Sequence, residues 1–595
     1  MLSYRKLAMR VLGRPLHTGR IDSPRPASQR AAAFILTAAM LTTLAAPAFA
    51  DIWHIENGDI TISAGESGNN VTQNNNTTYG DTNTIITNQN KDTASSHTVT
   101  IEAEKKDDKV EVTFENVNIE ATGNKAAVSV TGSGNTTIKL DGDNALKSDT
   151  YRSGIYGSGS LTISGGENDS LTAQGGSGAD GIYSSGSLTI SGGTVTANGD
   201  DGGRGIYSRG GVTISGGSTV TANGRSGTIS GGDGICSSGG VTISGGSTVT
   251  ANGGNGGSIG GGSGIYSNGS VTISGGTVNA AGGDGQDGCG GDGIRSISGG
   301  VTISGGTVTA NGGNSTNSSG GYGIISLDVA ISSGTVTANG GDSKDGYGGD
   351  GIHSNGVTIS GGTVKTNGGN GNGGNGGGNG IISFDHVAIS GGTVKAAGGN
   401  GGNGSRSDVG NGIISSVIDL SGSLELTAKA GSPNGKALSQ AGHELDLNDI
   451  KDKLDPGAKV TTTDADGKVI QQVSPPRPVE PEESSSSSDG DSATPSAPAS
   501  PLPGLTVTDK SGQRISYTST QSGNTLTVCV GRLTASLHVS LAALLQLRAE
   551  GIETIAFQTV LCSTTLSLDE LLAMGGEDAE AVLTHRFTDS SLTVG

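Results

Sequence analysis

The chain has 595 residues, of which 109 are glycine, and aromatic residues make up only 3% of it. Its formal net charge is −20, which argues against binding to nucleic acid or to an anionic membrane surface, because both need basic patches. The scarcity of large side chains argues against an ordinary globular enzyme of this length.

The first 50 residues have the pattern of a secretory signal peptide. Arginines and lysines precede an apolar run at 31–50, which ends in Ala48-Phe49-Ala50, an A-x-A cleavage site. We therefore expect export, with cleavage near Ala50, and a secreted or cell-surface location. No later run of about 20 apolar residues follows, so membrane insertion is not expected.

Residues 51–150 contain alternating stretches, such as HTVTIEAE at 97–104 and NTTIKLDG at 135–142, without a regular repeat. We interpret them as an N-terminal cap and irregular early coils, because a repeat array needs atypical ends to close its core.

A repeat begins near residue 151. Its frame is G-I-x-S, then (L/V)-T-I-S-G-G, then T-V-T-A-N-G, followed by a variable loop rich in Gly, Asn and Asp. The Gly-Ile step recurs at Ile155, Ile182, Ile206, Ile235, Ile265, Ile294, Ile324, Ile352, Ile381 and Ile413. Within one copy, Leu188, Ile190, Val195 and Ala197 share one face of a period-two pattern, which predicts three short strands per coil.

Three short strands cannot bury their apolar face alone, but stacked coils can. We therefore predict a mainly β protein, a right-handed parallel β-helix of about ten or more three-strand coils that occupies residues 151–473 with its closing coils. The long, variable loop at one corner favours the right-handed form.

The remainder of the chain changes composition. Residues 474–504 are rich in proline and serine and are predicted to be a disordered linker. Residues 505–595 are predicted to form a small α+β module, with helices in SLAALLQLRAEG (540–551) and SLDELLAMGG. A disulfide between Cys529 and Cys562 of this module is compatible with export, but their spacing leaves it open.

Aspartates form the first group of candidate site residues. Asp180, Asp233, Asp292 and Asp350 each precede a Gly-Ile step in alternate coils, about 9–10 Å apart. One calcium ion cannot bridge two of them, so a site would need loop partners, for which Asp284, Asp287, Asp342 and Asp345 are available. The alternative is that alternate placement avoids stacking like charges.

Tyrosines form the second group. The residue after each of these isoleucines should point outward, which predicts an exposed ladder containing Tyr156, Tyr183, Tyr207 and Tyr266. Rings two coils apart roughly match the two-residue repeat of an extended β-1,4 glycan, on whose sugar faces they would stack. The alternative is an ordinary cross-strand surface ladder.

Coils of the form GIYSSGSLTISGGTVTANG resemble the secreted carbohydrate-binding, pectate-lyase-like β-helix repeat proteins of anaerobic Gram-positive bacteria. The resemblance covers roughly residues 115–430. It implies calcium-assisted binding of plant-type or cell-wall polysaccharide, with the calcium held by acidic residues, and it implies no catalysis.

We therefore expect an exported, non-catalytic carbohydrate-binding protein, with calcium as its cofactor. The first alternative is a structural or adhesive cell-surface repeat protein. The second is a polysaccharide lyase or hydrolase, for which no Ser/His/Asp set and no base beside clustered acids is recognisable in the coils.

Overall fold

The computed structural model describes residues 51–475, apart from 373–374 and 403–409, and residues 505–594, apart from 510–511, 516, 523, 531, 533, 560–562, 575–579 and 586–589. The predicted signal peptide and nearly all of the predicted linker lie outside these ranges, as does Cys562. The described residues form two compact units, one on each side of residues 476–504.

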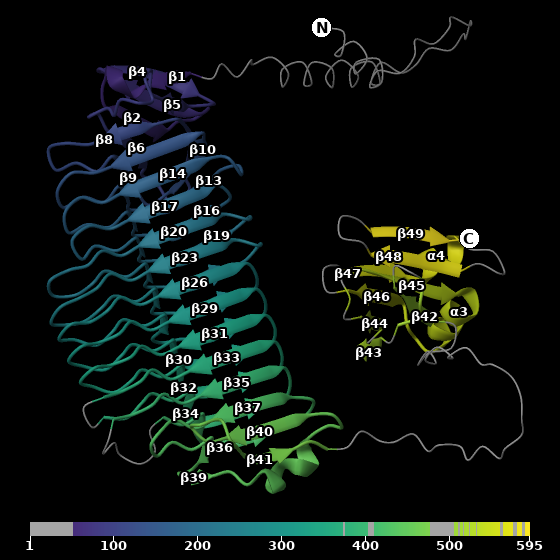
Figure 1. The fold of residues 1–595 in the computed structure, drawn as a ribbon. Helices are drawn as coiled ribbons and strands as arrows, with labels where there is room; N and C mark the ends of the chain where they lie inside the picture. Colours follow the sequence, from purple (N-terminus) through teal and green to yellow (C-terminus); the bar gives the residue numbers. More distant parts are fainter. Residues whose placement is uncertain are drawn as a thin grey trace, which may run out of the picture. The chain divides into compact units, whose positions relative to one another are not determined.

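The first unit is a parallel β-helix of about 16 turns (Figure 1). The first and second strands of the turns lie in one 27-stranded sheet, and the third strands lie in a sheet of 14 strands. Each strand of a regular turn pairs in parallel with its equivalent in the next turn, as Ile182 does with Ile206. The predicted mainly β solenoid is thereby confirmed.

The strands of the regular turns are short and recur in the same order. The first strands are β12 (Ile155–Gly157), β15 (Ile182–Ser184), β18 (Ile206–Ser208), β21 (Ile235–Ser237), β24 (Ile265–Ser267) and β27 (Ile294–Ser296). The second strands are β13 (Ser160–Ser164), β16 (Leu188–Ser191), β19 (Val212–Ser215), β22 (Val241–Ile243), β25 (Val271–Ile273) and β28 (Val301–Ile303). The third strands are β8 (Asn118–Glu120), β11 (Asp143–Lys147), β14 (Ser170–Gln174), β17 (Thr194–Asn198), β20 (Thr219–Asn223), β23 (Thr248–Asn252), β26 (Thr277–Ala281), β29 (Thr307–Asn311), β31 (Thr335–Asn339), β33 (Thr363–Asn367), β35 (Thr393–Ala397), β37 (Glu425–Lys429) and β40 (Lys459–Thr463).

The later turns depart from the predicted three strands. A shorter or glycine-free connection, such as Leu327-Asp328, keeps the backbone extended there, so the first and second strands merge. The merged strands are β30 (Ile324–Ile331), β32 (Ile352–Ile359), β34 (Ile381–Ile389) and β36 (Ile413–Leu420).

The interior is built from stacked side chains. Leu188, Ile190, Val195 and Ala197 are fully buried, as the alternation predicts. Ser184, the serine of the G-I-x-S frame, is also fully buried. Its hydroxyl donates to the carbonyl oxygens of Gly159 and Gly186, both at 3.2 Å, so its polar atom is satisfied inside the solenoid.

Asparagines form a hydrogen-bonded ladder at the ends of the third strands. The Nδ2 of Asn223 donates to Oδ1 of Asn198, and Asn252 donates to Asn223, each at 2.8 Å. The ladder is broken at Ala281 and resumes from Asn311 to Asn367. These side chains link successive turns where the loops begin.

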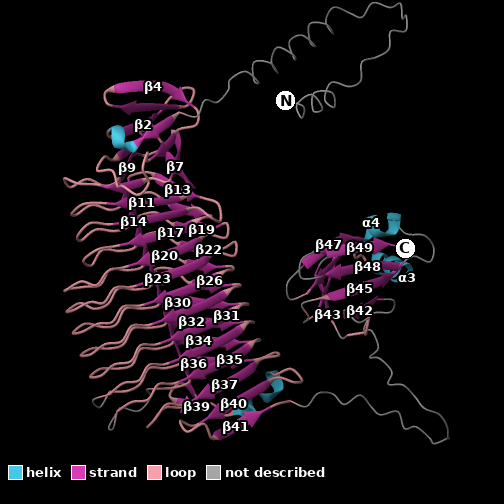
Figure 2. Ribbon diagram, turned by 45° about the horizontal axis from the view of Figure 1, so that its top comes forward, coloured by secondary structure: helices cyan, strands magenta, loops and turns pink. Residues whose placement is uncertain are grey.

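The described parts of the glycine-rich loops after the third strands stack along one side of the solenoid (Figure 2). Gly283 N donates to Gly262 O of the preceding turn at 2.8 Å, and within that preceding loop Gly262 N donates to Gly254 O at 2.9 Å. A Cβ built on Gly283 would lie 2.0 Å from the oxygen of Gly254. Glycine is thus required there by the close approach of backbones, and not only by tight turns.

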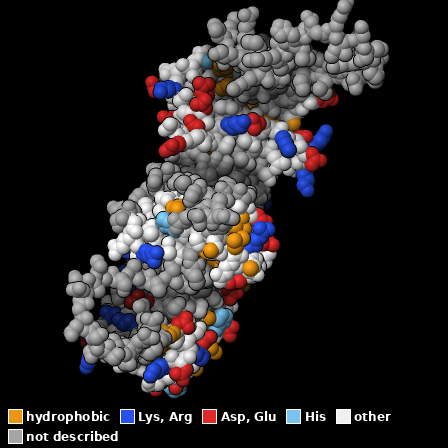
Figure 3. Space-filling view, turned by 90° about the vertical axis from the view of Figure 1, so that its right-hand side faces the viewer, with side chains coloured by type: hydrophobic (Ala, Val, Ile, Leu, Met, Phe, Trp, Pro, Cys, Tyr) orange, Lys and Arg blue, Asp and Glu red, His pale blue; other side chains and the backbone are white. Residues whose placement is uncertain are grey.

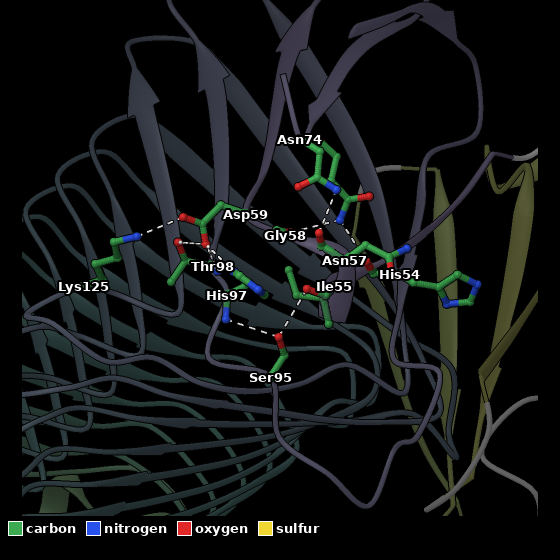
Figure 4. A network of polar contacts seen from close by, with 11 residues as sticks. His54, Ile55, Asn57, Gly58, Asp59, Asn74, Ser95, His97, Thr98 and Lys125 are labelled. Atoms are coloured by element: carbon green, nitrogen blue, oxygen red, sulfur yellow. Dashed lines mark hydrogen bonds and ion pairs between the residues drawn. The ribbon is translucent and has the colours of Figure 1, made fainter. Parts of the chain in front are cut away.

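The N-terminal end of the solenoid is closed by a folded-over segment. It comprises β1 (Ile52–His54), the 3-10 helix η1 (Ile55–Asn57), β2 (Ile60–Ala64), β3 (Asn69–Gln73), β4 (Asn76–Asp81) and β5 (Ile85–Thr87), and it leads into β6 (Val99–Ala103), β7 (Lys109–Glu115), β9 (Val128–Gly132) and β10 (Asn135–Asp141). Polar contacts tie it to the first turns (Figure 4). Asp59 accepts from the amide of Thr98 at 2.8 Å and from Lys125 Nζ at 2.9 Å, and the Ser95 hydroxyl donates to Ile55 O at 3.2 Å.

The other end of the solenoid also departs from the regular turn. It is closed by β38 (Leu438–Gln440), β39 (His443–Glu444), the 3-10 helix η2 (Leu447–Lys453) and β41 (Val469–Val473). Two of these pairings are antiparallel, β38 with β39 and β40 with β41. Both ends are therefore covered, as a solenoid core requires.

The second unit contains two four-stranded sheets and two helices. Its strands are β42 (Leu505–Thr508), β43 (Thr518–Ser522), β44 (Thr525–Cys529), β45 (Ala535–Ser540), β46 (Thr554–Gln558), β47 (Ser563–Ser567), β48 (Glu580–His585) and β49 (Ser590–Val594). Its helices are α3 (Leu541–Ala549), capped by the Ser540 hydroxyl, and α4 (Leu568–Met574), close to the two predicted positions. Cys529 is a free thiol that donates to Gln558 Oε1 at 3.3 Å.

Charge is distributed rather than gathered on the face drawn in Figure 3, where acidic and basic side chains lie interspersed.

The stacked loops make a stability prediction. Gly283→Ala should lower the free energy of unfolding by about 1–3 kcal/mol, because its methyl group has no space between the backbones. Gly275→Ala is the matched control, since no atom lies within 4 Å of a Cβ at that position. Thermal denaturation followed by circular dichroism measures both, and equal melting temperatures would contradict the stacking argument.

Candidate functional site

A groove of about 800 Å³ runs along the face formed by the first strands. Its floor carries the outward residues Tyr207, Cys236, Tyr266 and Arg295 from four successive turns. Its wall is the backbone of the stacked loops, with Gly202, Gly203, Gly231, Gly232, Gly261, Gly262, Gly290 and Gly291. We call this hollow the tyrosine groove. The loops, which the sequence shows only as variable, turn a flat strand face into a concave one.

The structure brings Tyr156, Tyr183 and Tyr207 into ring contact along the ladder, since Tyr183 also meets Tyr207 edge to face with centroids 5.3 Å apart, and it places two of the four predicted tyrosines in the groove. Tyr207 and Tyr266 line the tyrosine groove. Tyr156 and Tyr183 stack on one another with ring centroids 5.0 Å apart and an interplanar angle of 3°, so each ring covers a face of the other. Tyr183, Tyr207 and Tyr266 are half-buried, whereas a flat row of exposed rings was expected. The predicted outward direction is correct, but only one pair lies in the groove.

Cys236 interrupts the tyrosine ladder between Tyr207 and Tyr266. It occupies the outward position but is only 5% exposed. Burial, followed by the nearby Asp233, raises the pKa of its thiol to about 12. The side chain is therefore an uncharged spacer, and the two tyrosines of the groove stand two turns apart.

The aspartates before the Gly-Ile steps each cap a backbone amide in the next turn. Oδ1 of Asp180 accepts from Arg204 N, that of Asp233 from Ser263 N and that of Asp292 from Tyr322 N, each at 2.8 Å. Oδ1 of Asp350 accepts from the amide of Asn379 at 2.7 Å. Each aspartate thus satisfies a backbone amide in the following turn, which itself carries no aspartate at this position. This capping is a second reason for placing aspartates in alternate turns, in addition to the separation of like charges.

Three of these aspartates also hold a cationic or ionisable partner with their second oxygen. Asp233 lies 3.3 Å from Arg204 Nε and Asp292 lies 2.9 Å from Arg295 Nη1. Asp350 lies 2.8 Å from His353 Nδ1. Burial raises the pKa of the carboxyl groups of Asp180, Asp233 and Asp292. The positive charge of Arg204 opposes this rise at Asp180 and Asp233, and that of Arg295 opposes it at Asp292.

Three of the four loop aspartates are engaged through their side chains. Asp284 Oδ1 accepts from Asn314 N at 2.7 Å and Asp342 Oδ1 accepts from Asn370 N at 2.6 Å. Asp287 Oδ1 accepts from the side chain of Asn317 at 2.7 Å. Asp345 contributes its backbone carbonyl, which accepts from Asn375 at 2.9 Å. Asp284 and Asp342 thereby continue a ladder of Asn and Asp side chains that links the loops.

The eight aspartates do not gather into a ligand set. Among the described residues, no group of three or more His, Cys, Asp or Glu side chains is placed to hold a metal ion. Asp284 is exposed on a loop, whereas Asp292 is buried at the groove. Calcium binding by these aspartates stays a prediction.

Sequence reasoning missed the side chains that pair with these aspartates. Arg295 and His353 each follow their aspartate by three residues and stand on the outward ladder. Arg204 lies over the ring of Tyr207, with its guanidinium carbon 4.6 Å from the ring centroid. The sequence D-G-I-R at 292–295 and D-G-I-H at 350–353 could have indicated these pairs, because both repeat the same spacing.

Comparison of the chain with family models, curated proteins and solved structures yields no match. Among the described residues, no helix is long and apolar enough to cross a membrane. The function is therefore inferred from the groove itself.

The capping role of Asp180 is testable by substitution. Asp180→Ala should lower the free energy of unfolding by about 1–3 kcal/mol, because the buried amide of Arg204 loses its acceptor. Asp180→Asn keeps an acceptor oxygen and should change the free energy of unfolding little. Asn379 and Asn411 stand at equivalent positions and accept the amide of the next turn in the same way. The exposed Asp107→Ala is the control, and thermal denaturation is the measurement.

The same variant gives a pH dependence. Burial raises the pKa of Asp180, so the folded wild-type protein loses stability as pH rises through that raised value. Asp180→Asn does not titrate, and its stability relative to wild type should therefore increase from about pH 4 towards neutrality. A constant difference between the two proteins across this range would contradict the assignment.

Proposed function

We propose that the protein is an exported, non-catalytic carbohydrate-binding protein that holds a linear glycan in the tyrosine groove. The glycan backbone runs parallel to the solenoid axis, across successive turns. The signal-like segment at 1–50 supports export.

The spacing of Tyr207 and Tyr266 carries this proposal. They line one groove two turns apart, which is about 10 Å at the usual strand spacing. An extended β-1,4 glycan presents equivalent sugar faces at roughly this repeat, and aromatic rings offer apolar contact to such faces. A groove of about 800 Å³ falls within the range of ligand-binding clefts.

The charged groups of the groove support a neutral ligand and no catalysis. Arg204 and Arg295 are each paired with an aspartate, so they bring no unpaired positive charge to an acidic sugar. Asp233 and Asp292 have both oxygens engaged, which leaves them poorly placed to act as general bases. Calcium assistance, which the family resemblance implies, is a separate prediction that the comparison with and without EDTA tests.

The proposal predicts a specific loss of glycan binding. Tyr207→Ala and Tyr266→Ala should each weaken binding to an insoluble β-1,4 glycan by about 2- to 12-fold, the value of one aromatic contact. Tyr156→Ala on the same ladder and Tyr79→Ala in the cap lie outside the groove and should bind as wild type.

Binding is measured by depletion isotherms with and without EDTA, after circular dichroism has shown that each variant is folded. No binding to any glycan would overturn the proposal, as would wild-type affinity in the two groove variants. Loss of binding in EDTA alone would restore calcium to the mechanism.

A further inference from the structure

A second hollow lies beside the tyrosine groove on the same strand face, and four of its ten lining residues are large and apolar. It has a volume of about 250 Å³. Its apolar wall is formed by Ile297, Ile325, Leu327 and Phe384, and we call it the apolar trough. Arg295 lines both hollows, so the trough continues the groove towards the C-terminal turns.

The trough arises from a change at one position of the repeat. The residue after the buried serine of the first strand is polar in the earlier turns, where Ser185, Arg209, Ser238 and Asn268 stand. In later turns the same position holds Ile297, Leu327 and Phe384, with Asn355 between the last two.

These side chains are exposed rather than packed into the core. Ile297 is 39% exposed, Leu327 43% and Phe384 59%. Ile297 and Leu327 stand on adjacent turns, and Phe384 follows two turns later beyond Asn355, so three large apolar side chains are exposed around one hollow.

The polar edge of the trough is held in place by neighbouring side chains. His353 is held by Asp350 and lies between two rings, with centroids 4.5 Å from Tyr322 and 5.3 Å from Phe384. Arg295 is held by Asp292 at the opposite edge. The lining is therefore pre-organised by its neighbours before any ligand arrives.

Size decides between the possible occupants. A volume of about 250 Å³ is too small for a helix, whose diameter with side chains is about 10–12 Å. Four apolar residues also fall far short of the roughly 1,000 Å² that a stable contact with a second copy needs. The volume is below that of a typical whole-ligand pocket and suits a small group carried on a larger ligand.

We propose that the apolar trough receives the ester-linked acyl or aryl groups of a glycan whose backbone lies in the tyrosine groove. This inference rests on the proposed function and specifies its substrate class as neutral polysaccharides that carry acetyl or aromatic ester substituents. The apolar part of the substituent contacts Leu327 and Phe384, while Arg295 marks the junction with the sugar chain.

The test compares acetylated xylan with the same xylan after chemical deacetylation, using the full chain. The wild-type protein should bind the acetylated polymer about 4- to 15-fold more tightly, the value of burying one or two carbons of each substituent. A double variant, Leu327→Ser with Phe384→Ser, should lose this preference and retain its affinity for the deacetylated polymer. Val469→Ser is the control, because it removes an apolar side chain that is 51% exposed outside the trough. It should change neither the affinity for the acetylated polymer nor that for the deacetylated one.

Each outcome separates the two proposals. Equal binding of both polymers by the wild-type protein overturns the ester inference and leaves glycan binding intact. A preference that survives in the double variant overturns the assignment to the trough. Absence of binding to either polymer, and to a feruloylated xylan, overturns the ester inference, whereas absence of binding to every glycan also overturns the proposed function.

Discussion

Hydrogen bonding between equivalent strands of successive turns is the interaction on which the rest of this structure depends. Because Ile182 pairs with Ile206 and Leu188 with Val212, each residue of a turn lies next to its counterpart in the following turn. A residue type that recurs at one position of the repeat therefore forms a ladder of side chains about 4.8 Å apart. The buried isoleucines, the buried serines and the asparagine ladder all result from this register.

The second constraint is the stacking of the loops. Their backbones approach so closely that Gly283 has no room for a methyl group, and amides of one turn bond to carbonyls of another. The stacked glycines form a wall beside the first strands, to which loop side chains such as Ser230, Ile259 and Cys289 add. The tyrosine groove exists because this wall stands next to an outward ladder that carries large side chains.

The acidic residues show how structural and functional roles overlap. Asp292 caps the amide of Tyr322 with one oxygen and holds Arg295 with the other. A side chain engaged in this way fixes a guanidinium at the groove. The alternate aspartates therefore cap backbone amides, and Asp233, Asp292 and Asp350 also position two arginines and a histidine.

The sequence by itself determined the solenoid, because a period-two pattern repeated with fixed Gly-Ile steps has few other ways to bury Leu188 and Ile190. It also determined that Tyr207 and Tyr266 point outward, since strand alternation settles direction locally. It did not determine that Tyr156 and Tyr183 stack on one another, that Cys236 is buried, or that the loops form a wall. Those features depend on contacts between turns and on loop backbones whose glycine-rich sequences carry no periodic signal, so only the tertiary structure decided where the groove and the apolar trough lie.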